Sequence, residues 1–117
     1  MREQRDPRQQ LPLTPLSLQM LVVLSRGPTH GYSIIKALVD RAGSGHKPGT
    51  GTFYSAIHRM VGEGLIEDAN APADGDSRRR HYRITEFGFN VLRAETARLR
   101  VLLSDVDLVH SDTAKQS

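Results

Sequence analysis

Three stretches in the first half of the chain repeat apolar residues at the spacing of amphipathic helices. The repeats predict helices over residues 15–26, 30–42 and 51–63. At the first of these, Thr14 followed by Pro15 is typical of an N-cap and the first helical position. A glycine follows directly after each predicted helix, as is common at helix ends. We therefore expect three short helices that share one core.

Two short apolar runs then predict strands over residues 65–69 and 80–84. The segment between them is polar and basic, and it contains Pro72 and Gly75. This pattern predicts a β-hairpin with a long basic tip.

A longer apolar repeat follows, with Thr85 as its candidate cap and an end near Val109. Such a helix is about 36 Å long, whereas a domain of this size has a radius of gyration near 13 Å. We expect the helix to extend beyond its own core and pair with a second copy; the alternative is that its stripe belongs to the chain's own core. The predicted dimerisation residues are Leu92, Leu99, Leu102, Leu103, Val106 and Val109.

Both ends of the chain are polar and show neither the helical nor the strand period. The expected organisation is a flexible arm over 1–13, a winged helix-turn-helix over 14–85, a dimerisation helix over 86–109 and a disordered tail over 110–117. The predicted fold class is thus mainly α with a small β-hairpin wing. In that fold the third helix enters the major groove of DNA, and the hairpin reaches the backbone beside it.

The charge of the chain indicates a polyanionic partner only when charged residues are counted separately for each segment. The 117 residues carry 16 Lys and Arg against 13 Asp and Glu. Residues 26–83 contain nine basic and six acidic residues, whereas 84–117 contain four and five. Three arginines gather at the hairpin tip, and the polar face of the third helix has no acidic residue. Short donors on or near that face suit phosphates and base edges: Thr50, Thr52, Tyr54, Ser55, His58 and Arg59.

Four motifs in this order resemble the PadR family of bacterial transcriptional regulators, over about residues 14–92. The motifs are His30-Gly31-Tyr32, Gly51-Thr52-Phe53-Tyr54, RMVGEGLI over 59–66, and YRITEFG over 82–88.

The resemblance implies a homodimer that binds pseudo-palindromic operators and represses until a small molecule or another signal releases it. It also places Tyr32 near DNA and gives Gly31 and Gly88 packing roles. A single terminal helix is typical of the short subtype of the family. Because the sequence contains no Trp, we do not expect an effector to bind between tryptophan rings across the dimer interface. The complete predicted set of DNA contacts is Tyr32, Lys47, Thr50, Thr52, Tyr54, Ser55, His58, Arg59, Arg78, Arg79 and Arg80.

Other classes of function find less support in the sequence. The histidines lack the close pairing of metal sites. The sequence contains neither a nucleophile with a base at usable spacing nor a phosphate-binding loop. We therefore expect neither an enzyme nor a cofactor. The longest apolar run has five residues, no signal peptide is evident and cysteine is absent, so we expect a soluble cytoplasmic protein. Two alternatives stay open: a winged-helix adaptor that binds a protein, and a sensor with a small-molecule pocket between the last helix and the first.

Overall fold

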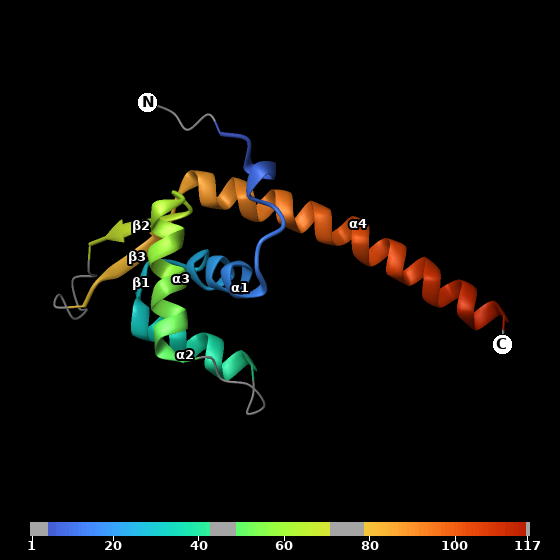
Figure 1. The fold of residues 1–117 in the computed structure, drawn as a ribbon, viewed down its shortest axis with the longest axis horizontal. Coiled ribbons are helices and arrows are strands. Elements are labelled where there is room, and N and C mark those ends of the chain that lie inside the picture. Colours follow the sequence, from blue (N-terminus) through green and yellow to red (C-terminus); the bar gives the residue numbers. More distant parts are fainter. Residues whose placement is uncertain (1–4, 43–48, 71–78, 117) are drawn as a thin grey trace.

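A computed structural model describes residues 5–42, 49–70 and 79–116 of the chain. A domain of short helices and a small sheet occupies one end, and one long helix leads away from it (Figure 1). The elements are, in order, η1 (Pro7–Gln10), α1 (Pro15–Leu24), β1 (Thr29–His30), α2 (Gly31–Ala42), α3 (Thr50–Gly62), β2 (Ile66–Ala69), β3 (His81–Ile84) and α4 (Glu86–Gln116). Apart from η1 and β1, which were not predicted, this is the predicted order of three helices, a hairpin and a long final helix.

The starts and ends of the helices follow local chemistry. The Thr14 side chain accepts a hydrogen bond from the Ser17 amide at 3.1 Å, and Pro15 occupies the first turn of α1. At the end of α3, Gly64 adopts a φ of 76°, which only glycine reaches at little steric cost. That turn redirects the chain from α3 into β2.

The sheet has three antiparallel strands in the order β1-β3-β2, one strand more than the predicted hairpin. β3 pairs with β2 in a register that sets Ile66 opposite Ile84 and Asp68 opposite Tyr82. On its other side, Thr29 of β1 also lies opposite Tyr82. The two-residue strand was missed because it is too short to show alternation, and its pairing ties the start of α2 to the wing.

α1 lies at the centre of the core, as its apolar circumference predicted. Met20, Leu21 and Leu24 are at most 1% exposed. Around them pack apolar side chains from every other major element: Ile34, Leu38, Phe53, Ala56, Ile57, Met60, Leu65, Ile66, Tyr82, Phe87 and Val91. The core therefore fixes α2, α3, the sheet and the first turns of α4 as one unit.

Gly88 lets α4 pack directly on the chain that leads into β2. A Cβ at this position would overlap the backbone carbonyl of Leu65. The same junction is held by Thr85, whose hydroxyl donates to the Gly64 carbonyl at 2.6 Å and accepts from the Gly88 amide at 2.9 Å. The packing role predicted for Gly88 is confirmed.

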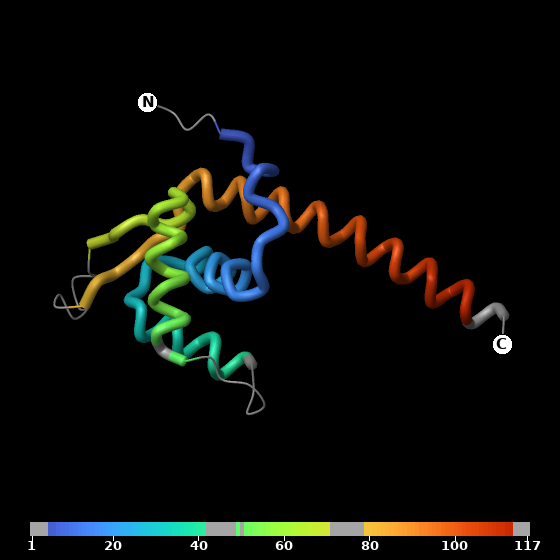
Figure 2. Tube along the Cα trace, in the orientation of Figure 1, coloured from blue at the N-terminus to red at the C-terminus, as the bar shows by residue number. Residues whose placement is uncertain are grey.

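α4 is longer than predicted and reaches Gln116 rather than Val109. Its 31 residues span about 46 Å at 1.5 Å each. The described chain measures 60 × 41 × 24 Å, with a radius of gyration of 17.1 Å, and Figure 2 shows the second half of α4 standing clear of all other elements. The disordered tail expected over 110–117 is therefore wrong as far as residue 116, because no glycine or proline ends the helix there.

The expected flexible arm is also wrong for the part that the structure describes. Residues 7–10 form a 3-10 helix that lies across the first half of α4, and Asp6 caps it through the Arg8 amide. Leu11 and Leu13 pack against the core. The segment has no helical period, so its sequence alone did not reveal these tertiary contacts.

A buried carboxylate anchors this N-terminal segment. Glu95 of α4 is 1% exposed, and it accepts hydrogen bonds from the Leu13 amide at 2.8 Å and from Arg98. The hydrogen bond from Arg98 holds the pKa of Glu95 below its usual value, the Leu13 amide acts in the same direction, and burial opposes both. The carboxylate is therefore ionised at neutral pH and joins α4 to the segment that precedes α1.

Candidate nucleic-acid interface

α3 presents one apolar and one polar face, as its sequence predicted. Phe53, Ala56, Ile57 and Met60 are buried in the core. The polar positions from Thr52 to Arg59 are exposed: Thr52, Tyr54, Ser55, His58 and Arg59. No acidic residue occurs in the sequence of α3, so its outer face offers hydroxyl, imidazole and guanidinium donors without a like charge that would repel phosphate.

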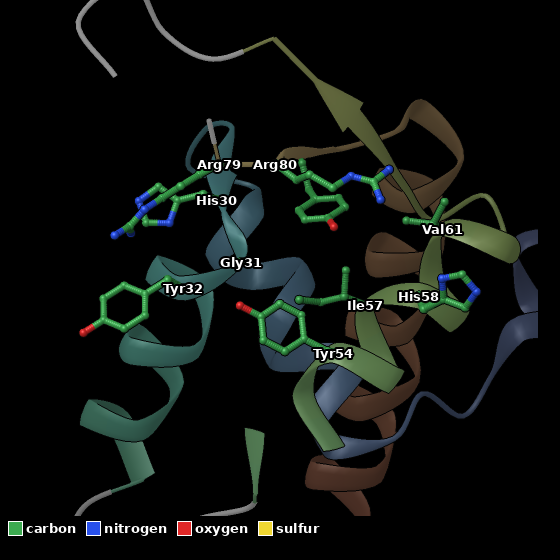
Figure 3. A pocket seen from close by; sticks show the side chains of 10 residues that line it. His30, Gly31, Tyr32, Tyr54, Ile57, His58, Val61, Arg79 and Arg80 are labelled. Atoms are coloured by element: carbon green, nitrogen blue, oxygen red, sulfur yellow. The ribbon is translucent and has the colours of Figure 1, made fainter. Parts of the chain in front are cut away.

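A groove of about 700 Å³ lies between α3, the start of α2 and the wing. Figure 3 shows Tyr32 from α2 and Tyr54 from α3 on its floor, with Arg79 and Arg80 entering from the wing. The two tyrosines are 58% and 46% exposed, so both rings are available to a ligand. The structure thus brings three predicted groups of DNA contacts, from α2, α3 and the wing, to one concave surface.

Gly31 allows α2 and α3 to approach closely beside this groove. A Cβ on Gly31 would lie 3.1 Å from the Tyr54 ring, closer than ordinary van der Waals contact. The packing role predicted for Gly31 is confirmed, and it brings the start of α2 against α3.

Aromatic and imidazole rings order the α2 side of the groove. His30 accepts a hydrogen bond at Nδ1 from the Ser33 amide at 3.2 Å and so caps α2. Its ring stacks on Tyr32 and meets His81 edge-on, at centroid distances of 6.3 and 5.4 Å. The Arg79 guanidinium lies 5.2 Å from the centre of the Tyr32 ring, within the range of a cation–π contact. Arg79 is therefore positioned beside Tyr32 at the mouth of the groove.

The other described wing arginines form ion pairs with β2. Arg80 Nη2 lies 2.8 and 2.9 Å from the two carboxylate oxygens of Asp68. Arg83 Nε lies 2.7 Å from Glu67 Oε2. Both pairs are solvent-exposed, so each is weak on its own. The positive charge of the wing is thus lower in this conformation than the arginine count suggests.

Arg59 is held on the opposite side of α3. Its Nη2 donates to the hydroxyl of Ser17 at 3.0 Å, and its Nε lies 3.9 Å from Glu63. A second hollow, of about 530 Å³, runs beside it between α3 and the start of α1, lined by Thr14, Leu16, Gly51, Thr52, Ser55, Ala56 and Arg59. Arg59 therefore belongs to the α1 side of the exposed surface, away from the wing.

Three predicted contacts have limited or no structural description. Lys47 and Arg78 lie outside the described residues, and Thr50 is the first residue of α3. Conversely, sequence reasoning missed the partners Ser17, Asp68 and Glu67. Cross-strand charge alternation in the hairpin could have indicated the last two, but only with the strand register known.

The predicted dimerisation stripe separates into two parts. Leu92 packs against the chain's own core, and Leu99 is half-buried. Beyond Leu99, six apolar side chains of α4 are exposed by 38–64%: Val101, Leu102, Leu103, Val106, Leu108 and Val109. Of these, Val101 and Leu108 were not part of the predicted stripe. Most of the exposed apolar side chains of α4 therefore lie from Val101 onward.

Two other kinds of site find no support in the described residues. Residues 5–42, 49–70 and 79–116 contain no group of three or more His, Asp or Glu side chains arranged to hold a metal ion. No helix within the same ranges is long and apolar enough to cross a membrane.

Two similar solved structures at 25% identity or more are PadR-type transcriptional regulators. A PadR family regulator from Eggerthella lenta is 28% identical, with 88% of this chain and 83% of that chain covered at a TM-score of 0.63. A PadR-like regulator from Bacillus cereus is 25% identical over 80% of this chain and 89% of that one, at 0.67. A PadR family regulator from Clostridium difficile, 22% identical, covers 82% and 98% at 0.68.

Sequence comparison agrees with the fold. The chain is 35% identical over 79 residues to an uncharacterised 37.1 kDa protein in transposon TN4556 of Streptomyces fradiae, a match that covers 66% of this chain and 21% of that protein. The family model of PadR-like transcriptional regulators matches residues 20–94. Its members are regulators and not enzymes. The chain belongs to the PadR-like family of transcriptional regulators.

Proposed function

We propose that this regulator binds DNA sequence-specifically, with α3 in the major groove and the wing on the adjoining backbone. The observation that carries the proposal is the exposed, acid-free face of α3, which meets the arginines of the wing across one groove. A protruding α-helix fits the width of the major groove. The groove beside it suits a sugar-phosphate strand because arginines and tyrosines line it together.

Each group of contacts has its own role in this proposal. Ser55 and His58, near the middle of α3, face base edges, and Thr52 lies near the helix start. Tyr32, Arg79 and Arg80 bind phosphates of the DNA strand that lies in the protein's groove. Tyrosine hydroxyls and guanidinium groups contact the DNA backbone without distinguishing its sequence. Lys47, Thr50 and Arg78 remain predicted DNA contacts from the sequence alone.

Titration of labelled duplexes by fluorescence anisotropy tests sequence specificity. We expect a duplex from the protein's own promoter to bind at least about a thousandfold more tightly than a scrambled duplex at physiological salt. Equal affinity for the two duplexes would contradict sequence-specific recognition. No binding to either would favour a protein-binding adaptor.

We also propose that α4 joins two copies of the chain. The exposed apolar side chains beyond Leu99 support this step, because a monomer rarely leaves so many on one projecting helix. Two linked domains would place two α3 helices on half-sites about 34 Å apart. A pseudo-palindromic operator follows from the two-fold symmetry of such a dimer.

The family resemblance extends the proposal to repression that a small molecule or another signal relieves. A dimer bound across a promoter excludes RNA polymerase from the same DNA. A reporter gene under the protein's own promoter should lose expression when the protein is supplied, and an increase in expression would indicate an activator instead.

A further inference from the structure

The two faces of the hairpin carry equivalent ion pairs in different surroundings. Residues opposite each other in an antiparallel pair share a face of the sheet. Asp68 is opposite Tyr82, and Arg80 precedes Tyr82 by two residues, so these three share one face. Glu67 is opposite Arg83 on the other face.

Only the first of these faces belongs to the groove. Arg80 and Tyr82 line it together with Tyr54 and His58 of α3, and Figure 3 shows the Arg80 side chain on the wing side of the groove. Arg83 is not among the groove's lining residues. A DNA strand in the groove would therefore meet Arg80 and not Arg83.

The Arg80 guanidinium is engaged before any DNA arrives. One nitrogen contacts both Asp68 oxygens at 2.8 and 2.9 Å, and the group lies 5.9 Å from the centre of the Tyr82 ring. A phosphate oxygen seeks N–H donors of the same guanidinium, of which the carboxylate already occupies Nη2. The side chains of Arg80 and Asp68 are 73% and 59% exposed, so a phosphate can reach and displace the carboxylate.

We propose that Asp68 is a built-in competitor of DNA phosphate for Arg80 and so limits how strongly the wing binds any DNA. This inference rests on the proposed function, because it specifies how one backbone contact is weakened. Since phosphate contacts carry no sequence information, Asp68 lowers affinity for all duplexes alike. Discrimination between sequences stays with α3.

The test compares Asp68→Asn with Glu67→Gln in the full chain, using the promoter duplex and a scrambled duplex over a range of salt. Each substitution removes one negative charge from β2, so the net charge is matched. We expect Asp68→Asn to tighten binding to both duplexes about threefold to tenfold. It should also steepen the slope of log affinity against log salt by about 0.9, the value for one added phosphate contact. Glu67→Gln should change affinity less than about twofold.

A second pair of variants separates release of Arg80 from loss of a repulsive charge. In an Arg80→Ala background, Asp68→Asn should tighten binding by less than about twofold, because no guanidinium remains to be released. An equal gain in both backgrounds would contradict the proposal, as would unchanged or weaker binding by Asp68→Asn alone. The ratio of promoter to scrambled affinity in the parent protein reports on the proposed function separately.

Discussion

Single residues explain why this surface is ordered before it meets a partner. Tyr54 packs against Gly31, Arg59 is held by Ser17 and Arg79 lies over Tyr32. Each side chain is thus fixed by a neighbour from another element. Preorganised side chains lose less conformational entropy on binding, so the exposed face of α3 and the wing present a defined pattern of donors.

Glu95 gives a residue-level prediction for stability and its dependence on pH. Glu95→Gln should lower the free energy of unfolding by about 1.5–3 kcal/mol at pH 7, the range for hydrogen bonds to a charged group. Because the folded state lowers the pKa of Glu95, its carboxylate stabilises the fold above the unfolded pKa, near 4.3. That contribution is lost as the pH falls through the lower pKa of the folded state.

Urea denaturation of the parent and the Gln variant at pH 7 and below pH 4 measures this difference. The gap in free energy between the two proteins should shrink toward the acidic end. A gap of the same size at every pH would mean that the charge of Glu95 contributes nothing and that only its shape matters.

At the scale of elements, the close approach of α4 to the chain entering β2 depends on a missing side chain. Gly88→Ala should lower the free energy of unfolding by about 1–3 kcal/mol, because the new methyl group overlaps the Leu65 carbonyl and must displace α4 or β2. Gly62→Ala, at the end of α3, is the matched control because an added Cβ there meets nothing within 4 Å. The control should stay within about 1 kcal/mol of the parent. Chemical denaturation that ranks the two variants equally would contradict this packing argument.

The elements that sequence predicts best are those with a clear period. The helices at 15–24, 31–42 and 50–62 and the strands at 66–69 and 81–84 fall within two residues of their predicted bounds. β1 and η1 were missed because they exist only through tertiary contacts: β1 pairs with β3, and η1 packs on α4. The end of α4 was missed because its last turns are polar, without the apolar period that marked its start.

Residues of the candidate interface could be predicted from the sequence, but their contacts with one another could not. The polar face of α3 follows from helical spacing alone. The ion pairs of Arg80 and Arg83 depend on the register between β2 and β3, and the bond from Arg59 to Ser17 joins residues 42 positions apart. Such long-range neighbours are not visible in the sequence until the fold is known.

At the scale of the whole molecule, the exposed apolar side chains of α4 support the proposed dimer. Leu103→Asp with Val106→Asp should convert a dimer into a monomer, since two buried carboxylates would have no partner across the seam. Ser104→Asp adds one carboxylate on a side of α4 that faces away from Leu103 and Val106, and it serves as the control. Sedimentation velocity at micromolar concentration should give two copies for the parent and the control and one for the double variant. A monomeric parent would contradict the assembly.

Hydroxyl-radical footprinting on the protein's own promoter tests both the proposed dimer and the proposed contact of α3 with the major groove. Two protected segments should appear, with centres about 34 Å or 10–10.5 base pairs apart, because each copy sets one α3 helix in successive turns of the major groove. A single protected segment, or uniform protection along the duplex at the same protein concentration, would contradict the account.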